Sequence, residues 1–296
     1  MALRIGGVPE HFNEPWHDVL KLASSATWIS YPGGTGAMCE SLQKKEIDCA
    51  LLLTEGAVKY CLEKRDCLLH SVYVASPLVW GVHVGEKSRF KDFTLSSSES
   101  SDREVTFAIS RFGSGSHLMA FVLARQMKWN RLRFEVVGNL KGAQEFLQNT
   151  PDALFMWEKA MTDPLVKRGV FKRIGQVPTP WPCFVLAVRK DISTEQGGRL
   201  KSILEEVKRA CGSFKENRSK SIDRVVGKFG IEKHLVEEWF DQLRFGSEEG
   251  FDQTGLRMLE MVRDTLVTVG QLPQSLQTAN IAEITVNNPS ETRAKL

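Results

Sequence analysis

The chain has 296 residues, of which 42% are hydrophobic and 25% are charged, a balance that is typical of globular domains. Its 39 basic residues nearly match its 36 acidic ones and are interspersed with them, so the net charge of +3 leaves no clustered basic footprint for nucleic acid. No run approaches the roughly 18 apolar residues of a membrane span. We therefore expect neither nucleic-acid binding nor membrane insertion.

Strand and helix patterns alternate through the first part of the chain. Apolar strand patterns at 3–8, 28–31 and 47–53 are each followed by a helix pattern, and the run at 47–53 is almost unbroken. Unbroken apolar runs are typical of strands that are buried on both faces. The alternation of such strands with helices predicts a parallel sheet with right-handed crossovers.

The next part of the chain leaves this sheet and begins a second one. Residues 68–84 are apolar without a helical period and carry Pro77, which favours two extended segments. A polar surface loop is expected at 94–103. A second strand–helix alternation follows it, with strands predicted at 105–110, 134–137 and 153–157 and helices at 113–127 and 141–147.

The last third of the chain is predicted to supply one more strand and then to become helical. Residues 184–188 form a strand pattern, and apolar residues at helical spacing follow until Gly270 and Pro273 end the last helix. Residues from 281 onward are expected to form an extended tail. The sequence thus predicts the α/β class, with mostly parallel sheets flanked by helices.

The residues that follow the predicted strands are the candidate ligand contacts, because ligands of open α/β sheets bind beyond the carboxyl ends of the strands. Small, hydroxyl and aromatic side chains recur there in both halves of the chain, which predicts two facing half-sites. The predicted contacts are Phe12, Asn13, Trp16, Gly34, Thr35, Thr54, Glu55, Ser110, Arg111, Gly113, Ser114, Ser116, His117, Trp157, Glu158 and Trp181.

Two glycine- and hydroxyl-rich segments, 33–36 and 113–116, each open a predicted helix. A helix start carries unpaired N–H groups and the positive end of the helix dipole, and glycine lets a ligand approach the backbone. The ligand is therefore expected to be anionic or polar-aromatic. The alternative is that the glycines only form turns and the hydroxyls only cap helices. Neither segment matches GxxxxGK[ST] or GxGxxG, so a nucleotide enzyme is not favoured.

No catalytic group, metal site or cofactor is predicted. The histidines, including His11 and His117, are isolated in the sequence, and the six cysteines show neither a CxxC pair nor zinc-ligand spacing. Reduced, structural thiols favour a reducing compartment. The first residues lack the pattern of a secretory signal, so we expect a cytoplasmic location unless a signal is missing from this sequence.

Short blocks spread over residues 3–270 share their order and spacing with a known family. The blocks are 4–9, 33–36, 46–50, 54–56, 109–117, 154–158 and 180–184. Together they resemble type 2 periplasmic substrate-binding proteins of the sulfonate, taurine, nitrate and thiamine-precursor branch. The last three blocks are most similar to stand-alone fungal and bacterial members. The resemblance implies a two-lobed fold with a ligand in the cleft, residues 1–84 and 185–296 forming one lobe and 85–184 the other.

The expected function is non-catalytic binding of one small molecule by closure of the two lobes. One alternative is an enzyme of thiamine-pyrimidine precursor synthesis, because eukaryotic relatives of this fold carry a cysteine-rich iron motif and a lysine for pyridoxal phosphate. No cysteine cluster of that kind is present here. Another alternative is a sensor that uses closure to recruit a partner. A membrane transporter is not an expected partner.

Overall fold

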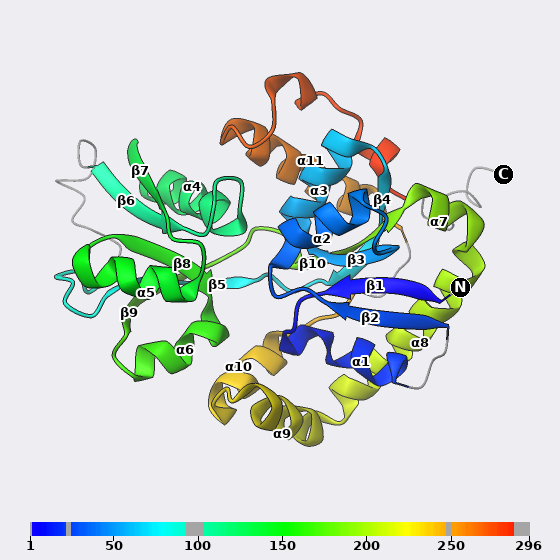
Figure 1. Cartoon of the computed structure of the whole chain (residues 1–296), viewed down its shortest axis with the longest axis horizontal. Helices are drawn as coiled ribbons and strands as arrows, with labels where there is room; N and C mark the ends of the chain where they lie inside the picture. The colour runs from blue at the N-terminus through cyan, green and yellow to red at the C-terminus, as the bar shows by residue number, and fades with distance from the viewer. Residues whose placement is uncertain (1, 22–24, 93–103, 247–249, 287–296) are drawn as a thin grey trace. The chain divides into compact units, whose positions relative to one another are not determined.

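The computed structural model describes residues 2–21, 25–92, 104–246 and 250–286. Contacts divide the chain into two compact units: unit 1 is Met1–Ser76 with Trp181–Leu296, and unit 2 is Pro77–Pro180. Each unit contains one five-stranded sheet flanked by helices (Figure 1), which confirms the predicted α/β class. The loop predicted at 94–103 lies outside the described residues.

The sheet of unit 1 has a parallel part and an antiparallel part. Its strand order is β2 (Ala26–Ser30), β1 (Leu3–Gly7), β3 (Cys49–Leu53), β10 (Phe184–Arg189) and β4 (Cys67–Val74). The first three strands are parallel, as predicted, and β10 runs antiparallel to both of its neighbours. The chain re-enters unit 1 at the carboxyl edge of β3, where the Cys183 N–H donates to the Ser76 carbonyl, so β10 runs back down the sheet.

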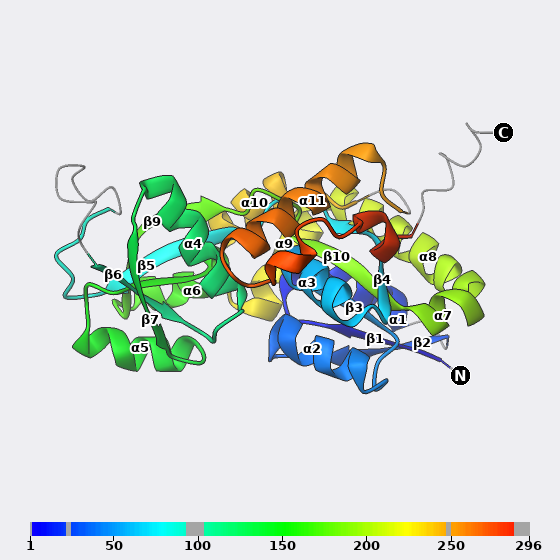
Figure 2. The same cartoon turned by 90° about the horizontal axis from the view of Figure 1, so that it is seen from above.

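Helices cover both faces of this sheet (Figures 1 and 2). One face carries α2 (Gly34–Gln43) and α3 (Thr54–Lys64), with α11 (Gln253–Thr268) packed on α3. The other carries α1 (Glu14–Leu20) and α8 (Gly197–Glu216), which contact each other. The remaining helices of unit 1 are α7 (Lys190–Glu195), α9 (Arg218–Phe229) and α10 (Lys233–Gln242).

The C-terminal segment is not the extended tail that the sequence predicts, as far as the structure describes it. A 3-10 helix spans Ile281–Ile284, and both of its isoleucines are buried. The Val286 N–H then donates to the Leu69 carbonyl of β4 at 2.9 Å. The apolar side chains of this segment therefore dock it against the edge strand of the sheet.

Unit 2 repeats the plan with a different helix arrangement. Its strand order is β7 (Arg131–Val136), β6 (Glu104–Ile109), β8 (Leu154–Glu158), β5 (Val79–Gly85) and β9 (Phe171–Pro178). The helices α4 (Gly115–Met127), α5 (Leu140–Asn149) and α6 (Lys159–Lys167) flank it. The core beneath α5 and α6 is built around Phe155 and Phe171.

Three features of unit 2 were not predicted. Helix α6 and strand β9 are absent from the expected elements, and β5 pairs with β8 and β9 although the sequence placed it at the end of the first lobe. The units divide after Ser76 and after Pro180, whereas the sequence placed the boundaries at 84 and 184.

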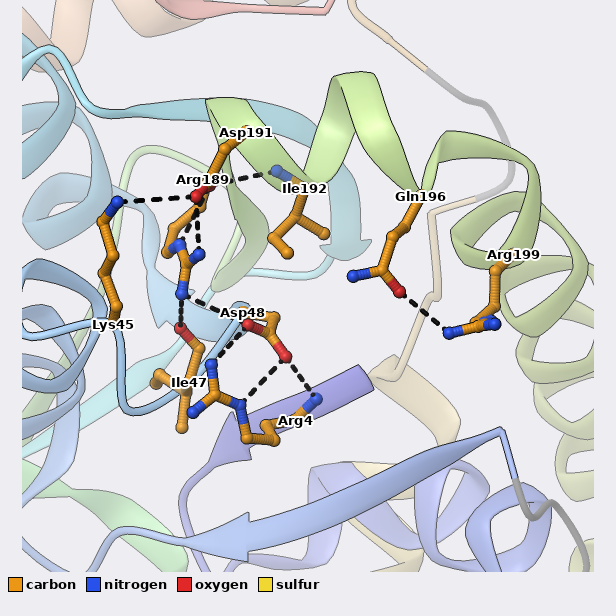
Figure 3. Close-up of polar contacts among 9 residues, drawn as sticks. All are labelled: Arg4, Lys45, Ile47, Asp48, Arg189, Asp191, Ile192, Gln196 and Arg199. Atoms are coloured by element: carbon orange, nitrogen blue, oxygen red, sulfur yellow. Dashed lines mark hydrogen bonds and ion pairs between the residues drawn. The ribbon is translucent and has the colours of Figure 1, made fainter. Parts of the chain in front are cut away.

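An ion-pair network closes the amino edge of the sheet in unit 1 (Figure 3). The buried Asp48 carboxylate accepts from the Arg4 backbone N–H at 2.8 Å, from the Arg4 guanidinium at 2.7 Å and from the Arg189 guanidinium at 3.2 Å. Arg189 also holds Asp191 at 2.6 Å. Because these residues belong to β1, to the start of β3 and to the end of β10, the network ties three strands together at the edge opposite to Thr54.

Candidate functional site

The carboxyl edge of the unit 1 sheet brings several predicted contacts together. The Thr54 hydroxyl donates to the Pro182 carbonyl at 2.5 Å, and the Thr35 hydroxyl accepts from the Leu53 N–H at 3.2 Å. The Phe12 ring packs edge-on against Phe184, with ring centres 5.5 Å apart. Phe12, Thr35 and Thr54 therefore surround the entry of the chain into β10. Both hydroxyls hold the backbone there, a structural role that the sequence did not reveal.

Glu55 and Trp181 form a buried pair beside Thr54. The indole N–H of Trp181 donates to Glu55 Oε2 at 2.9 Å, and the two residues are 4% and 2% exposed. Glu55 Oε1 has no hydrogen-bond partner among the described residues. Burial raises the pKa of the Glu55 carboxyl, although the Trp181 bond opposes the shift. One oxygen of Glu55 is thus used by Trp181 and the other is buried without a partner in the described part of the chain.

Asn13 also has one polar atom that is hydrogen-bonded and one that is not. Its side-chain amide donates to the Val8 carbonyl at 2.8 Å, which fixes the turn that leads from β1 into α1. Its Oδ1 atom is buried and has no partner in the part of the chain that the structure describes. Buried polar atoms are usually paired, so Asn13 and Glu55 each leave one buried acceptor oxygen unsatisfied at this edge.

The predicted contacts Gly34 and Trp16 have other roles than the residues of this edge. Gly34 is the first residue of α2 and has a positive φ of 68°, so it serves the turn into the helix, and it is half-buried. Trp16 packs on the sheet face against Trp28 and Tyr73, with ring centres 6.4 and 6.1 Å away. The structure therefore does not bring Trp16 to the edge residues Thr54 and Glu55.

In unit 2, three hydroxyls meet at the start of α4; we call Ser110, Ser114 and Ser116 the serine cluster. Ser116 Oγ lies 3.3 Å from Ser110 Oγ and 3.0 Å from Ser114 Oγ, and it accepts from the Ser110 N–H at 3.0 Å. Ser114 is the N-cap of α4 and accepts from the His117 N–H at 3.3 Å. The helix start leaves the N–H groups of Gly115 and Ser116 without intrahelical acceptors.

The loop before α4 carries the remaining predicted contacts of this site. Gly113 adopts a positive φ of 78°, and its N–H donates to His117 Nδ1 at 3.1 Å. The proton of a neutral His117 ring is therefore on Nε2. Arg111 is exposed, and the Phe112 ring is 63% exposed while it contacts His117 edge-on. A cation and an apolar ring are thus presented beside the serine cluster.

Trp157 and Glu158 have structural roles at the end of β8. Trp157 stacks on Phe155 at 5.6 Å and packs against the core under α5 and α6. Glu158 caps α6, because its carboxylate accepts from the Met161 N–H at 2.6 Å. Burial raises the pKa of Glu158 to about 6, against the opposing effect of its backbone hydrogen bonds.

The sequence missed the residues that hold the unit 1 edge together. Pro182 and Cys183 present their carbonyls to Thr54, and nothing in their local pattern indicates that role. No set of three His, Cys, Asp or Glu side chains within the described ranges is placed to hold a metal ion. In the same ranges no helix has the length and apolarity needed to cross a membrane.

Comparison with known proteins supports the fold. A family model described as Ca3427-like PBP matches residues 80–177, nearly the whole of unit 2. No curated protein sequence matches the chain. The sequence therefore resembles this family over one of its two units, as the blocks at 109–117 and 154–158 indicated.

Solved structures resemble the chain over its full length. The CA3427 gene product of Candida albicans, described as defining a new family with the generic periplasmic binding protein fold, is 23% identical, with 97% of each chain covered and a TM-score of 0.84. The alkanesulfonate-binding protein SsuA of Xanthomonas axonopodis pv. citri, bound to MOPS, is 16% identical, with 97% of this chain and 98% of that one covered and a TM-score of 0.75.

A third solved structure has the same fold at a lower sequence identity. PhnD1 of Prochlorococcus marinus, in complex with methylphosphonate, is 11% identical, with 92% of this chain and 99% of that chain covered and a TM-score of 0.60. At these identities the likeness shows the fold: the chain has the periplasmic-binding-protein fold that its sequence blocks predicted.

Proposed function

We propose that this chain binds a small anionic molecule without transforming it, and that the start of α4 is the anion site. The observation that carries the proposal is the serine cluster, which concentrates hydroxyls on a helix N-terminus beside an exposed arginine. The positive end of a helix dipole and its unpaired N–H groups favour an anion at this position.

A count of donors supports an anion in particular. Two contacts link the three hydroxyls of the serine cluster, so at least one of their hydrogens remains for an acceptor outside the cluster. The N–H groups of Gly115 and Ser116 add further donors, and Arg111 adds a charge. No carboxylate contacts the cluster among the described residues, so it offers an anion donors and no competing negative charge.

The energies are sufficient for useful affinity. A charge-assisted hydrogen bond contributes roughly 1.5–3 kcal/mol, and micromolar binding needs about −8 kcal/mol net. Four such bonds together with contact to the Phe112 ring cover that requirement after the costs of ordering the ligand.

We further propose that the same ligand contacts the edge of unit 1 and that the two units close on it. The buried acceptors Asn13 Oδ1 and Glu55 Oε1, next to the rings of Phe12 and Trp181, support a polar-aromatic or donor-bearing part of the ligand there. Neighbours of the same fold described as holding MOPS and methylphosphonate support an anionic group. Contacts to both units shift an open–closed equilibrium toward closure.

A thermal-shift screen of small sulfonates, phosphonates, phosphates and carboxylates tests the proposal, followed by titration calorimetry with the best anion. Ser116→Ala removes one donor and the support of Ser110, and we expect binding about tenfold weaker. Ser202→Ala on α8 is the matched control, because its hydroxyl only bonds the Gly198 carbonyl.

The charge is tested separately. Arg111→Gln is expected to weaken the same anion about threefold, since its guanidinium is exposed and screened. Arg125→Gln, at the other end of α4, is expected to leave the affinity unchanged. If no small anion raises the melting temperature, or if both serine variants bind alike, the α4 start is not an anion site.

A further inference from the structure

A cavity lies within unit 1, and none of the residues lining it belongs to the edge that carries Asn13, Thr54 and Glu55. It has a volume of about 250 Å³ and is formed where α8 passes over the sheet beside β4 and β10. Its largely apolar walls include Trp16, Tyr73, Leu186, Leu204, Val207 and Cys211, and residues 70–72 and Gly246 also line it. Trp16, predicted as a contact of the main site, therefore belongs to this cavity.

The walls are suited to an apolar guest. Leu186, Val207 and the Tyr73 ring are buried side chains with no polar atom to offer, because the Tyr73 hydroxyl already donates to the Phe12 carbonyl at 2.7 Å. The Cys211 thiol stays protonated, since burial raises its pKa to about 12. The volume exceeds the roughly 150 Å³ of an engineered cavity that holds benzene, so a small organic molecule fits.

One polar atom of the wall has no partner. Trp16 is 1% exposed, and its Nε1–H finds no acceptor among the described residues. The Nε1 atom itself is closed to water, as are the indole nitrogens of Trp28, Trp80 and Trp239, so it does not face the open space of the cavity. The Trp16 ring therefore contributes apolar wall.

The lining of the cavity also carries exposed charges. Lys201 and Lys208 lie on the face of α8 that lines the cavity, and neither forms an ion pair with another described residue. Glu205 lies between them on the same face. The two ammonium groups outweigh the single carboxylate, which favours a guest with a negative end.

We propose that this cavity binds a small carboxylic acid. Its apolar part lies against Leu186, Val207 and the Tyr73 ring, and its carboxylate oxygens accept from the ammonium groups of Lys201 and Lys208. This site is independent of the proposed anion site at α4. With about eight non-hydrogen atoms, a short-chain acid is expected to bind in the millimolar range.

Titration of the full chain with hexanoate, followed by the indole N–H signals in proton–nitrogen NMR spectra, tests the proposal. Trp16→Phe identifies the Trp16 signal by its loss. We expect hexanoate to shift that signal saturably, with hexanol weaker and hexylamine weakest. Val207→Phe fills the cavity and is expected to abolish the shift while the remaining indole signals stay in place.

Two charge-reversal variants on α8 test whether a positive charge at the cavity is needed for binding. Lys208→Glu is expected to weaken hexanoate at least about threefold, whereas Arg209→Glu, an exposed residue next to it that does not line the cavity, is expected to have no effect. The proposal is overturned by an unmoved Trp16 signal, by a shift that survives Val207→Phe, or by equal binding of hexanoate and hexylamine.

Discussion

The ring of His11 is enclosed by aromatic side chains immediately before the predicted contacts Phe12 and Asn13. It lies 4.4 Å from the Trp239 ring and 5.9 Å from the Phe229 ring, and neither of its nitrogens has a partner among the described residues. Burial alone lowers its pKa from 6.5 to about 3. His11 is therefore neutral in the folded chain, and it serves the core.

Protonation links His11 to the stability of the fold. Between pH 6.5 and about 3, His11 is protonated in the unfolded chain and neutral in the folded chain. The contribution of His11 to the free energy of unfolding is fully present above pH 6.5. Below that pH it falls by about 1.4 kcal/mol per pH unit. His83, whose pKa is also lowered to about 3, adds a second contribution of the same sign.

His11→Phe is expected to remove the His11 part of this pH dependence, because the titrating ring is gone and the aromatic surroundings accept a phenyl ring. Urea denaturation at neutral pH and at about pH 5 measures the effect. His234→Phe is the control, since that side chain is 64% exposed. An unchanged slope in His11→Phe would show that the ring reaches a partner when protonated.

Trp181 shows how much a single buried donor contributes. Trp181→Phe keeps the apolar ring but leaves both oxygens of the buried Glu55 carboxyl without a side-chain donor. We expect a loss of about 1–3 kcal/mol in the free energy of unfolding. The double variant with Glu55→Gln is expected to recover part of it, because a neutral amide is cheaper to bury. A double variant as unstable as the sum of both changes would contradict this.

At the scale of the element, the network around Asp48 is the most consequential contact of the unit 1 sheet. Asp48 is 4% exposed and Arg189 7% exposed, so removing the carboxylate leaves a buried guanidinium with Asp191 as its remaining ion-pair partner. Asp48→Ala is therefore expected to cost about 3 kcal/mol in the free energy of unfolding.

The exposed pair of Arg218 and Asp241 is the matched comparison, with side chains 47% and 60% exposed. Asp241→Ala is expected to cost less than about 1 kcal/mol, because water screens the pair. Urea denaturation of the two variants measures both losses. Equal losses in the two variants would mean that burial does not decide the strength of these pairs.

Local signals failed for α6 and β9, for identifiable reasons. Pro164 lies inside α6 and interrupts the helical pattern. Strand β9 has a register shift against β5 between Val82 and His83, so its buried residues do not alternate regularly. The strands with unbroken apolar runs, β3 and β8, were predicted nearly to the residue.

At the scale of the whole molecule, the proposed closure makes a prediction about both units. The anion that ranks first in the thermal-shift screen is expected to slow amide hydrogen exchange at Gly113–Leu118 in unit 2 and also at Thr54–Ala57 in unit 1. Exchange in α9, which carries none of the predicted contacts, serves as the reference. Protection confined to unit 2 would support the anion site at α4 and contradict the proposal that the two units close on the ligand.

The serine cluster at the start of α4 was predictable because its residues are close together in the sequence. Ser110, Gly113, Ser114 and Ser116 lie within seven residues, and a strand end, a turn and a helix start place them together whatever the rest of the chain does. Propensity and capping rules act over such short distances. The sequence by itself therefore determined the α/β class, the order of most elements and the serine-lined helix start.

Only the tertiary structure decided which side chains meet at the carboxyl edge of the unit 1 sheet. Trp181 reaches Glu55 across 126 residues, and Thr54 reaches Pro182 across 128, because β10 returns antiparallel beside β3. The packing of separate elements also turned Trp16 and Trp157 onto the faces of their sheets. Contacts between distant segments depend on burial and strand direction, which no local pattern encodes.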